Sequence, residues 1–273
     1  MEGVTTDTTE LLAELERYYD TAPRAMCDTE EVGPFTVFVR RGNGFPYYAR
    51  PRLGLAAAEI TADDVTTVLS RQRELDVPRA VEWVHETTPS LLAAARPAGM
   101  TVEECPLLVL AAEPPEPDPE AGVRIVAVDD PDLKLVSAAV NVSFAHAGTA
   151  VGEASTAERD EEAALSSTHA ERITALMTAG LSVLAGAFDR EAGAVGGGSH
   201  NPRGEVTEIV GVAVLPAFRR RGLAAAITAQ LARHARDHGV WTVFCSAQDD
   251  AVARVYESVG FHRVGTACIA EAS

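Results

Sequence analysis

The sequence of 273 residues lacks most features of a secreted, membrane-bound or metal-binding protein. Its four cysteines are widely scattered, so they match neither the spacing of a metal site nor the density of a disulfide scaffold. The N-terminus is acidic and has no basic start followed by an apolar run, as a signal peptide would. No apolar run approaches the length that spans a bilayer. These absences predict a cytoplasmic protein with no bound metal and no membrane partner.

Positive charge is scarce as well. Lysine and arginine together number 23 against 40 aspartate and glutamate residues, which gives a formal net charge of −17. Because phosphate backbones bind to basic surface, this balance argues against nucleic acid as a partner. It suits a small cationic partner better, although surplus acid also simply improves solubility. The 47% hydrophobic content is enough for a buried core in one large domain or two modest ones.

A proline-rich, acidic segment divides the chain. The stretch "AAEPPEPDPEAG" at residues 111–122 follows the apolar run "CPLLVLA" and favours an extended linker between packed units. We therefore expect an N-terminal unit over residues 1–111, a linker over 112–121 and a C-terminal domain over 122–273.

The C-terminal part alternates between strand and helix patterns. Within residues 222–238, apolar side chains recur every four residues, which is typical of a helix with one buried face. The alternation predicts an α/β sandwich, a mixed sheet with flanking helices and parallel central strands. We expect strands at 123–127, 181–189, 205–215, 240–247 and 262–270, a further strand and turn within 193–204, and helices at 130–144, 157–179, 222–238 and 249–260.

The N-terminal part predicts a smaller α/β unit. Residues 35–41 and 46–54 flank a Gly-Asn-Gly hairpin signal at 42–44. We expect helices at 62–75 and 89–97, the second capped by Thr88, and strands at 80–85 and 101–111. When Gly99 is laid over Gly260, "EWVHETTPSLLAAARPAGM" matches "VFCSAQDDAVARVYESVGF" in pattern without a gap. This predicts a diverged internal duplication, with two unrelated β-α-β units as the alternative.

Three consecutive arginines, Arg219, Arg220 and Arg221, separate a β-like run from an alanine-rich helix. A helix N-terminus presents unpaired N–H groups and the positive end of the helix dipole, which attract anions. Gly222 and Ala224 keep the backbone approachable because neither carries a bulky side chain. The pattern suits a diphosphate, although taken alone it is better explained as a solvated basic turn.

Two motifs resemble those of the GNAT superfamily of N-acetyltransferases. "VAVLPAFRRRGLA" is similar to the family signature, an apolar strand and a proline before R/Q-x-x-G-x-G/A at the start of a helix. "DDAVARVYESVGF" is similar to the family's N-x-x-A-x-x-L-Y-x-x-x-G-F and matches at Tyr256, Gly260 and Phe261. Asp249 stands where asparagine is usual, and Val252 where alanine is usual. The likeness runs from about residue 123 to the C-terminus.

The resemblance implies a GNAT-like acetyltransferase fold with acetyl-CoA as donor. Its diphosphate would bind backbone N–H groups of residues 220–225, and its pantetheine arm would run beside residues 212–214. This requires the strand before the arginines to part from the next parallel strand, as a β-bulge would allow. The residues expected to bind the donor are Val212, Ala213, Val214, Arg219, Arg220, Arg221, Gly222, Leu223, Ala224, Ala225 and Asp249.

The resemblance also implies catalytic roles. Tyr256 would protonate the departing sulfur, and a backbone N–H near Val214 would polarise the acetyl carbonyl. Glu208 lies fourteen positions before Gly222, where the histone-acetyltransferase branch carries its base. Helix packing for Tyr256 and an exposed strand carboxylate for Glu208 are the alternatives. Phe144, His146 and His200 are weaker candidates for lining the acceptor site.

The expected function is acetyl transfer to a primary amine of a small molecule or peptide. A non-catalytic acyl-CoA-binding sensor or regulatory module is the alternative. The N-terminal half has no R-x-x-G-x-A at a strand-to-helix turn, and Ala95 falls where Tyr256 falls in the other half. We therefore expect a degenerate GNAT-like unit that no longer binds the donor, and that serves as a scaffold, a wall of the acceptor pocket or a surface for a homodimer. Its hairpin is expected to cover the sheet edge beyond Phe261.

Overall fold

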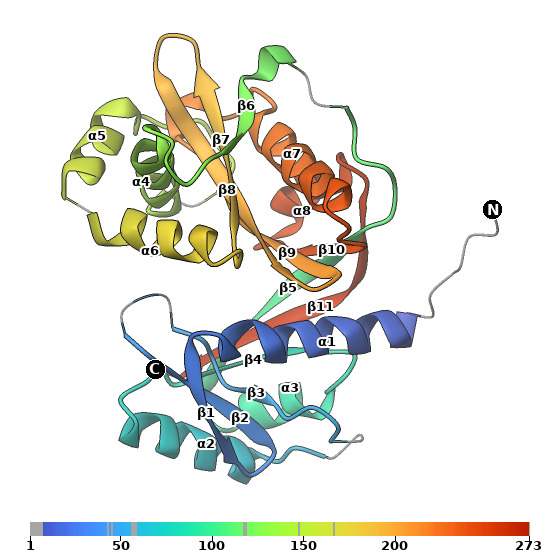
Figure 1. The fold of residues 1–273 in the computed structure, drawn as a ribbon. Helices are drawn as coiled ribbons and strands as arrows, with labels where there is room; N and C mark the ends of the chain where they lie inside the picture. The colour runs from blue at the N-terminus through green and yellow to red at the C-terminus, as the bar shows by residue number, and fades with distance from the viewer. Residues whose placement is uncertain are drawn as a thin grey trace. The chain divides into compact units, whose positions relative to one another are not determined.

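A computed structural model describes residues 8–42, 44, 46–55, 59–116, 119–146, 148–165 and 167–272 (Figure 1). The chain forms two compact units, Met1–Leu107 together with Val264–Ser273, and Leu108–Arg263. The division therefore lies just before the expected linker, and the last residues of the chain belong to the first unit. Eight strands of the chain form a mixed sheet in the order β4-β11-β5-β10-β9-β8-β7-β6, and three more form a separate sheet.

The second unit is the predicted α/β arrangement of a mixed sheet with flanking helices. β6 to β9 pair with one another antiparallel, and β9 pairs parallel with β10. The helix expected over 157–179 is two helices, α5 and α6. The strands are β6 (Val123–Val126), β7 (Val183–Asp189), β8 (Gly193–Arg203), β9 (Val206–Val214), β10 (Thr242–Ser246) and β11 (Phe261–Ala272), and the helices are α4 (Leu133–Phe144), α5 (Thr156–Leu165), α6 (Ser167–Thr178), α7 (Leu223–Asp237) and α8 (Asp250–Glu257).

Glycines in the middle of this sheet let helices approach both faces. A Cβ on Gly197 would lie 2.6 Å from Val136 Cγ1 of α4, and a Cβ on Gly198 would lie 3.2 Å from Ile227 Cγ2 of α7. Successive residues of a strand point to opposite faces, so α4 and α7 cover opposite faces, as Figure 1 also shows. The glycines of the run "GGGSH" carry no side chains, so both helices can pack closely against this strand.

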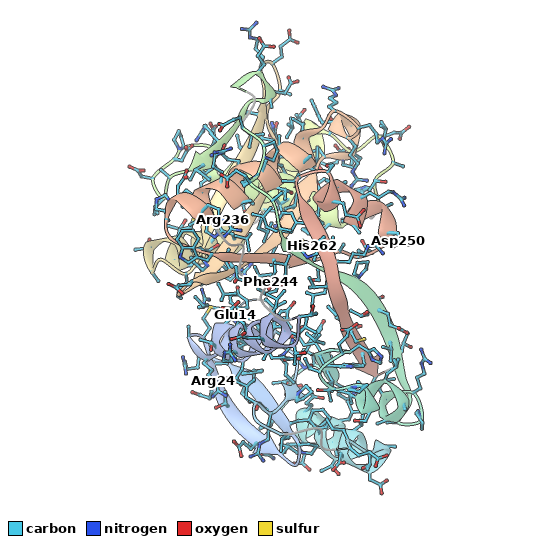
Figure 2. All side chains as sticks on the ribbon, turned by 90° about the vertical axis from the view of Figure 1, so that its right-hand side faces the viewer. Glu14, Arg24, Arg236, Phe244, Asp250 and His262 are labelled. Atoms are coloured by element: carbon cyan, nitrogen blue, oxygen red, sulfur yellow. The ribbon has the colours of Figure 1, made fainter. Side chains whose placement is uncertain are left out.

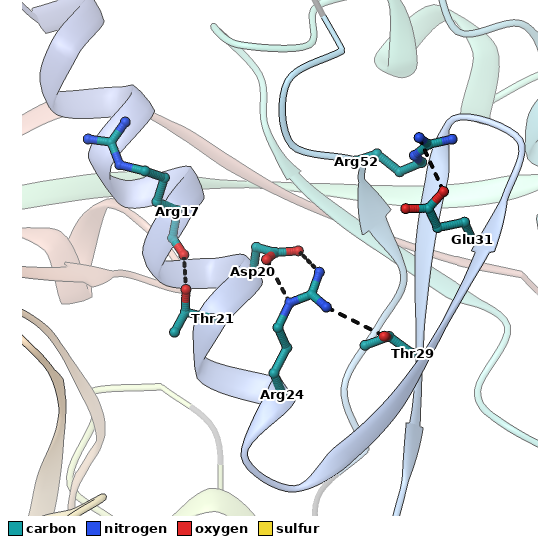
Figure 3. A network of polar contacts seen from close by, with 7 residues as sticks. All are labelled: Arg17, Asp20, Thr21, Arg24, Thr29, Glu31 and Arg52. Atoms are coloured by element: carbon teal, nitrogen blue, oxygen red, sulfur yellow. Dashed lines mark hydrogen bonds and ion pairs between the residues drawn. The ribbon is translucent and has the colours of Figure 1, made fainter.

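The first unit begins with a helix that the sequence analysis did not predict. Leu12, Leu15 and Tyr18 of α1 are buried on one face. At its end, Arg24 bonds both carboxylate oxygens of Asp20 and also Thr29 Oγ1, which ties α1 to β1 (Figure 3). The elements are α1 (Thr8–Arg24), β1 (Cys27–Val32), β2 (Phe35–Arg40), β3 (Arg50–Pro51), α2 (Ala62–Glu74), β4 (Ala80–Val84), α3 (Ser90–Ala95) and β5 (Met100–Leu110).

Local details of the first unit differ from the expectations. β2 pairs antiparallel with β3 in a register centred on residue 43, as the expected hairpin requires, but Asn43 itself lies outside the described residues. A second hairpin joins β1 and β2 at Gly33, whose φ of 56° suits a tight turn. The helix α3 is capped by Pro89 without a side-chain hydrogen bond, so Thr88 is not its N-cap.

The two units repeat one order of elements, an antiparallel meander followed by helix, strand, helix and strand. Their second halves keep one spacing, since α2 and α7 begin 161 positions apart, and so do β5 and β11. Gly99 and Gly260 both have positive φ, 83° and 105°, where helix turns into strand. The repeated order supports the predicted duplication over two unrelated units, although common ancestry stays a prediction.

The last strand completes the first unit. Residues Ala267 to Glu271 of β11 pair antiparallel with β4, from Val84 to Ala80. In the sheet order β11 stands between β4 and β5, whereas the hairpin strands β1, β2 and β3 form their own sheet. The expectation that the N-terminal hairpin covers the sheet edge beyond Phe261 is therefore wrong, because β4 and β5 occupy the positions on either side of β11.

Candidate active site

The site begins where β9 and β10 part. Their parallel pairing runs from Val206↔Thr242 to Glu208↔Phe244, and no later pair joins these two fully described strands although both continue. On its other edge β9 carries a bulge, since its register with β8 shifts between Ala213↔Gly197 and Val210↔Ser199. Gly211 takes a φ of 68° there. The predicted bulge and the predicted parting of the strands are both present.

The bulge leaves the backbone of Val214 facing the opening. Leu215 N–H donates to Val195 O on β8. Because the hydrogen-bonding edge alternates along an antiparallel strand, the N–H and C=O of Val214 point away from β8, toward the side of β10. The carbonyl accepts from Arg219 Nε at 3.1 Å. The N–H is the group that the sequence analysis expected to polarise an acyl carbonyl. The backbone groups of Val212 point to the same side as those of Val214. Val212 and Ala213 are half-buried.

The turn after β9 has the backbone of an anion-binding concavity. Arg220 and Gly222 both take positive φ, 65° and 78°. Gly222 is the N-cap of α7 and has no side chain that could accept from the first turn. The N–H groups of Leu223, Ala224 and Ala225 therefore lack an intrahelical acceptor. Alternating left-handed residues turn successive N–H groups inward, which suits a phosphate group.

The Arg219 guanidinium is taken up by backbone carbonyl groups. Its guanidinium donates to Val214 O, Ala150 O, Ser143 O and His146 O, at 3.1, 3.2, 3.2 and 2.6 Å. Its own N–H donates to Pro216 O. Partial burial without a carboxylate partner lowers the pKa of Arg219. The Arg219 side chain therefore points to backbone carbonyls, and its role in donor binding stays a prediction.

Arg220 and Arg221 are exposed beside the concavity. Arg221 lies over the ring of Phe218, 4.8 Å from its centroid, and pairs with Asp189 at 3.6 Å. Backbone N–H groups at the β7–β8 turn hold the pKa of Asp189 below its usual value. Phe218 and Asp189 were not predicted as parts of the site, since Asp189 is distant in sequence and has no motif around it.

Tyr256, Cys245 and Glu208 gather at the opening. Burial raises the pKa of Tyr256, and the charges of Cys245 and Glu208 raise it further. Burial, followed by Glu208, likewise raises the pKa of Cys245. The Tyr256 ring packs against Phe261 with centroids 5.9 Å apart. The two predicted catalytic side chains are therefore close enough for their charges to interact, and the raised pKa keeps the Cys245 thiol uncharged.

Glu208 belongs to the face of the sheet that α4 covers. Thr207 Oγ1 bonds His200 Nδ1 at 3.0 Å, and His200 bonds His234 of α7, so Thr207 faces α7. Its neighbour Glu208 then points to the opposite face. Phe244, its partner on β10, is labelled in Figure 2. Glu208 is half-buried on that face.

The remaining candidates have other partners. Asp249 caps α8, because its Oδ1 accepts from Val252 N at 2.8 Å. The next residue, Asp250, which is labelled in Figure 2, pairs with Arg263. His200 lies buried in β8 and not in a turn. Phe144 ends α4 with 61% of its surface exposed, and His146 follows it.

Two further properties bear on the kind of protein. Across the described ranges, no cluster of three histidine, cysteine, aspartate or glutamate side chains is arranged to hold a metal ion. None of the described helices is long and apolar enough to cross a membrane.

Known proteins resemble the chain at two levels. Residues 135–261 match the model of the acetyltransferase (GNAT) family. Among solved structures, a GCN5-related N-acetyltransferase from Kribbella flavida has a TM-score of 0.69 at 18% identity, covering 96% of this chain and 95% of that one. A GCN5-related N-acetyltransferase-like protein from Streptococcus suis 89/1591 has a TM-score of 0.54 at 14% identity, covering 97% and 99%.

A tandem GNAT protein from the clavulanic acid biosynthesis pathway has a TM-score of 0.53 at 16% identity, covering 88% of this chain and 78% of that one. A comparison with curated proteins finds no match. These structural likenesses show the fold over both units, and the family match covers the bulged strand, the arginine turn and the tyrosine helix. The chain therefore carries, over residues 135–261, a domain of the acetyltransferase (GNAT) family, a family of acyltransferases.

Proposed function

We propose that the chain is an N-acetyltransferase that moves an acetyl group from acetyl-CoA to a primary amine of a small molecule or peptide. The observation that carries this proposal is the open edge of β9 at Val214, which leads directly into the concave turn before α7. An extended chain with an amide backbone can pair with such an edge, and a diphosphate suits the turn. Members of this family typically use acyl-CoA.

The residues of the turn fit the donor. The first N–H groups of α7 have no competing side-chain cap, and Gly222 has no neighbouring atom within 4 Å of where a Cβ would stand. Ala224 and Ala225 add little bulk, so a phosphate can approach the backbone closely. Arg220 and Arg221 supply exposed positive charge beside the turn. When bound, acetyl-CoA would supply an acyl group activated as a thioester.

The neighbouring side chains suit amine acylation. The amine nitrogen forms a bond to the acetyl carbon, the carbon–sulfur bond breaks, and the amine proton passes to Glu208 directly or through water. The N–H of Val214 stabilises the negative charge that develops on the carbonyl oxygen. Tyr256 stays protonated at neutral pH because its pKa is raised, and it donates a hydrogen bond to the departing sulfur.

The test combines calorimetry with CoA and thiol release from acetyl-CoA over a panel of primary amines. We expect CoA binding and amine-dependent thiol release. Arg220→Glu should weaken CoA binding by at least about tenfold, because charge reversal repels the diphosphate. Arg17→Glu, the same charge change at an exposed position of α1, should leave binding unchanged. Binding without turnover would favour the non-catalytic acyl-CoA-binding role, and absence of binding would remove both.

A further inference from the structure

Arg219 stands at the centre of an unusual arrangement of backbone carbonyls. Its guanidinium is the common donor to the end of β9 at Val214, to the last turn of α4 at Ser143, to His146 just after that helix, and to Ala150. Four hydrogen bonds therefore join Arg219 to three segments, of which the farthest, at Ser143, is 76 residues away in sequence. The fork of the guanidinium makes this possible, since its donors point in fixed and different directions.

Two further contacts hold the same segment. Gly152 N–H donates to Pro216 O at 3.2 Å, and Ala217 N–H donates to Ala154 O at 3.1 Å. A Cβ on Gly152 would lie 3.0 Å from Pro216 Cβ, so the two backbones are in close contact. The chain between α4 and α5 is therefore fastened to the turn that follows β9.

The electrostatics of the contact are those of a partly buried cation at a helix C-terminus. The carbonyls at the end of α4 carry the negative end of its dipole, and the guanidinium neutralises it. The lowered pKa of Arg219 follows from burial, with no carboxylate offsetting it. The carbonyl dipoles stabilise the charge, and the four hydrogen bonds fix where the side chain lies.

We propose that Arg219 is a positioning residue for the amine acceptor and not a ligand of the donor. This inference rests on the proposed function. The segment that Arg219 fastens leaves α4 on the face of the sheet to which Glu208 points, and its anchor on β9 is the residue whose N–H faces the opening. Arg219 thereby sets the distance between the acceptor side of the site and the acyl-polarising N–H.

The test compares Arg219→Gln with Arg220→Gln, its exposed neighbour. For any amine that the wild-type protein acetylates, Arg219→Gln should raise the acceptor KM at least about tenfold and change the CoA Kd less than about threefold. Arg220→Gln should do the reverse. Cleavage by chymotrypsin after the exposed Phe144, followed by mass, should be faster in Arg219→Gln and unchanged in Arg220→Gln.

If Arg219→Gln fails to fold, Arg219→Lys is the variant to compare with the wild-type protein. An ammonium group can reach only part of the carbonyl set, so intermediate cleavage and an intermediate KM are expected, and wild-type values of both would overturn the proposal. A loss of CoA affinity equal to that of Arg220→Gln, with cleavage unchanged, would also overturn it. Failure of the proposed function has a different signature, which is absence of CoA binding and turnover in the wild-type protein.

Discussion

At the scale of single residues, removing the Tyr256 hydroxyl distinguishes a catalytic role from a role in binding. Tyr256→Phe keeps the ring that packs against Phe261 and removes only the acid. We expect kcat to fall by about 10²–10⁴-fold, the usual contribution of a positioned acid, with the CoA Kd within about threefold. Single-turnover thiol release and calorimetry measure the two quantities. An unchanged kcat would leave Tyr256 with a packing role alone.

A second residue-scale prediction concerns His200. Burial, followed by the charges of His234 and His238, lowers its pKa to about 3, well below the ordinary value near 6.5. A base with a lowered folded pKa stabilises the fold above its unfolded pKa, and this stability is lost as the pH falls from about 6.5 toward 3. The titration of His200 should therefore lower the free energy of unfolding by about 2 kcal/mol as the pH falls from 7 to 5.

Chemical denaturation at the two pH values measures this loss, and His200→Gln is the comparison. The groups around His200 are Thr207, His234 and His238, which stacks on His234 with centroids 4.0 Å apart, while Asp237 acts on His234 in the opposite sense. A variant that loses as much stability between pH 7 and pH 5 as the wild type would show that His200 is not the titrating group.

The sequence indicates residue types and their local positions, but not the partners of a long side chain. Gly222 and Ala224 follow from the motif because their role is local. Arg219 belongs to the same motif, yet its partners Ser143 and Ala150 lie 76 and 69 residues away and are backbone groups, which leave no trace in residue identity. The same reasoning explains why Asp189 was not predicted.

At the scale of elements, the N-termini of α2 and α7 occupy the same place in the repeated order and differ in what satisfies them. In α2, Thr61 Oγ1 accepts from Asp64 N, and Asp64 Oδ2 accepts from Thr61 N. This capping box occupies the helix N-terminus with a carboxylate. In α7, Gly222 leaves it open. This gives a physical reason for the predicted loss of donor binding in the first unit.

We therefore expect one CoA per chain. Asp64→Ala should lower the free energy of unfolding by about 1 kcal/mol, the usual value of a cap, and leave the stoichiometry and Kd of CoA unchanged. Calorimetry and denaturant titration check both. Two bound CoA molecules per wild-type chain would contradict the inactivation of the α2 terminus.

The elements that were predicted are those with a periodic pattern and a local stop. The strands β4, β7 and β9 and the helices α2 and α7 agree with expectation within about two residues. The helix α1 was not predicted, because an acidic, polar start hid a short buried stripe of Leu12, Leu15 and Tyr18. The exchange of β11 into the first unit depends on pairing across the whole chain, which local patterns do not encode.

At the scale of the whole molecule, the C-terminal domain should not be separable at the linker. Leu108 and Leu110 of β5 belong to the buried core of the second unit, and Cys268 and Ala270 of β11 belong to that of the first. A fragment of residues 123–273 should aggregate, because it lacks part of its core and exposes the strand edge of β11. Size-exclusion chromatography and circular dichroism test this against the full chain, and a stable monomeric fragment would contradict it.

The exchanged strand also has a consequence for synthesis. A ribosome releases the N-terminal unit first, and such units ordinarily fold while the rest of the chain is still being made. Here residues 264–272, which are translated after the whole second unit, pair with β4 and enter the core around Trp83. The first unit must therefore stay incomplete until the second unit has been translated, which leaves its unpaired strand edge in need of protection by chaperones during that interval.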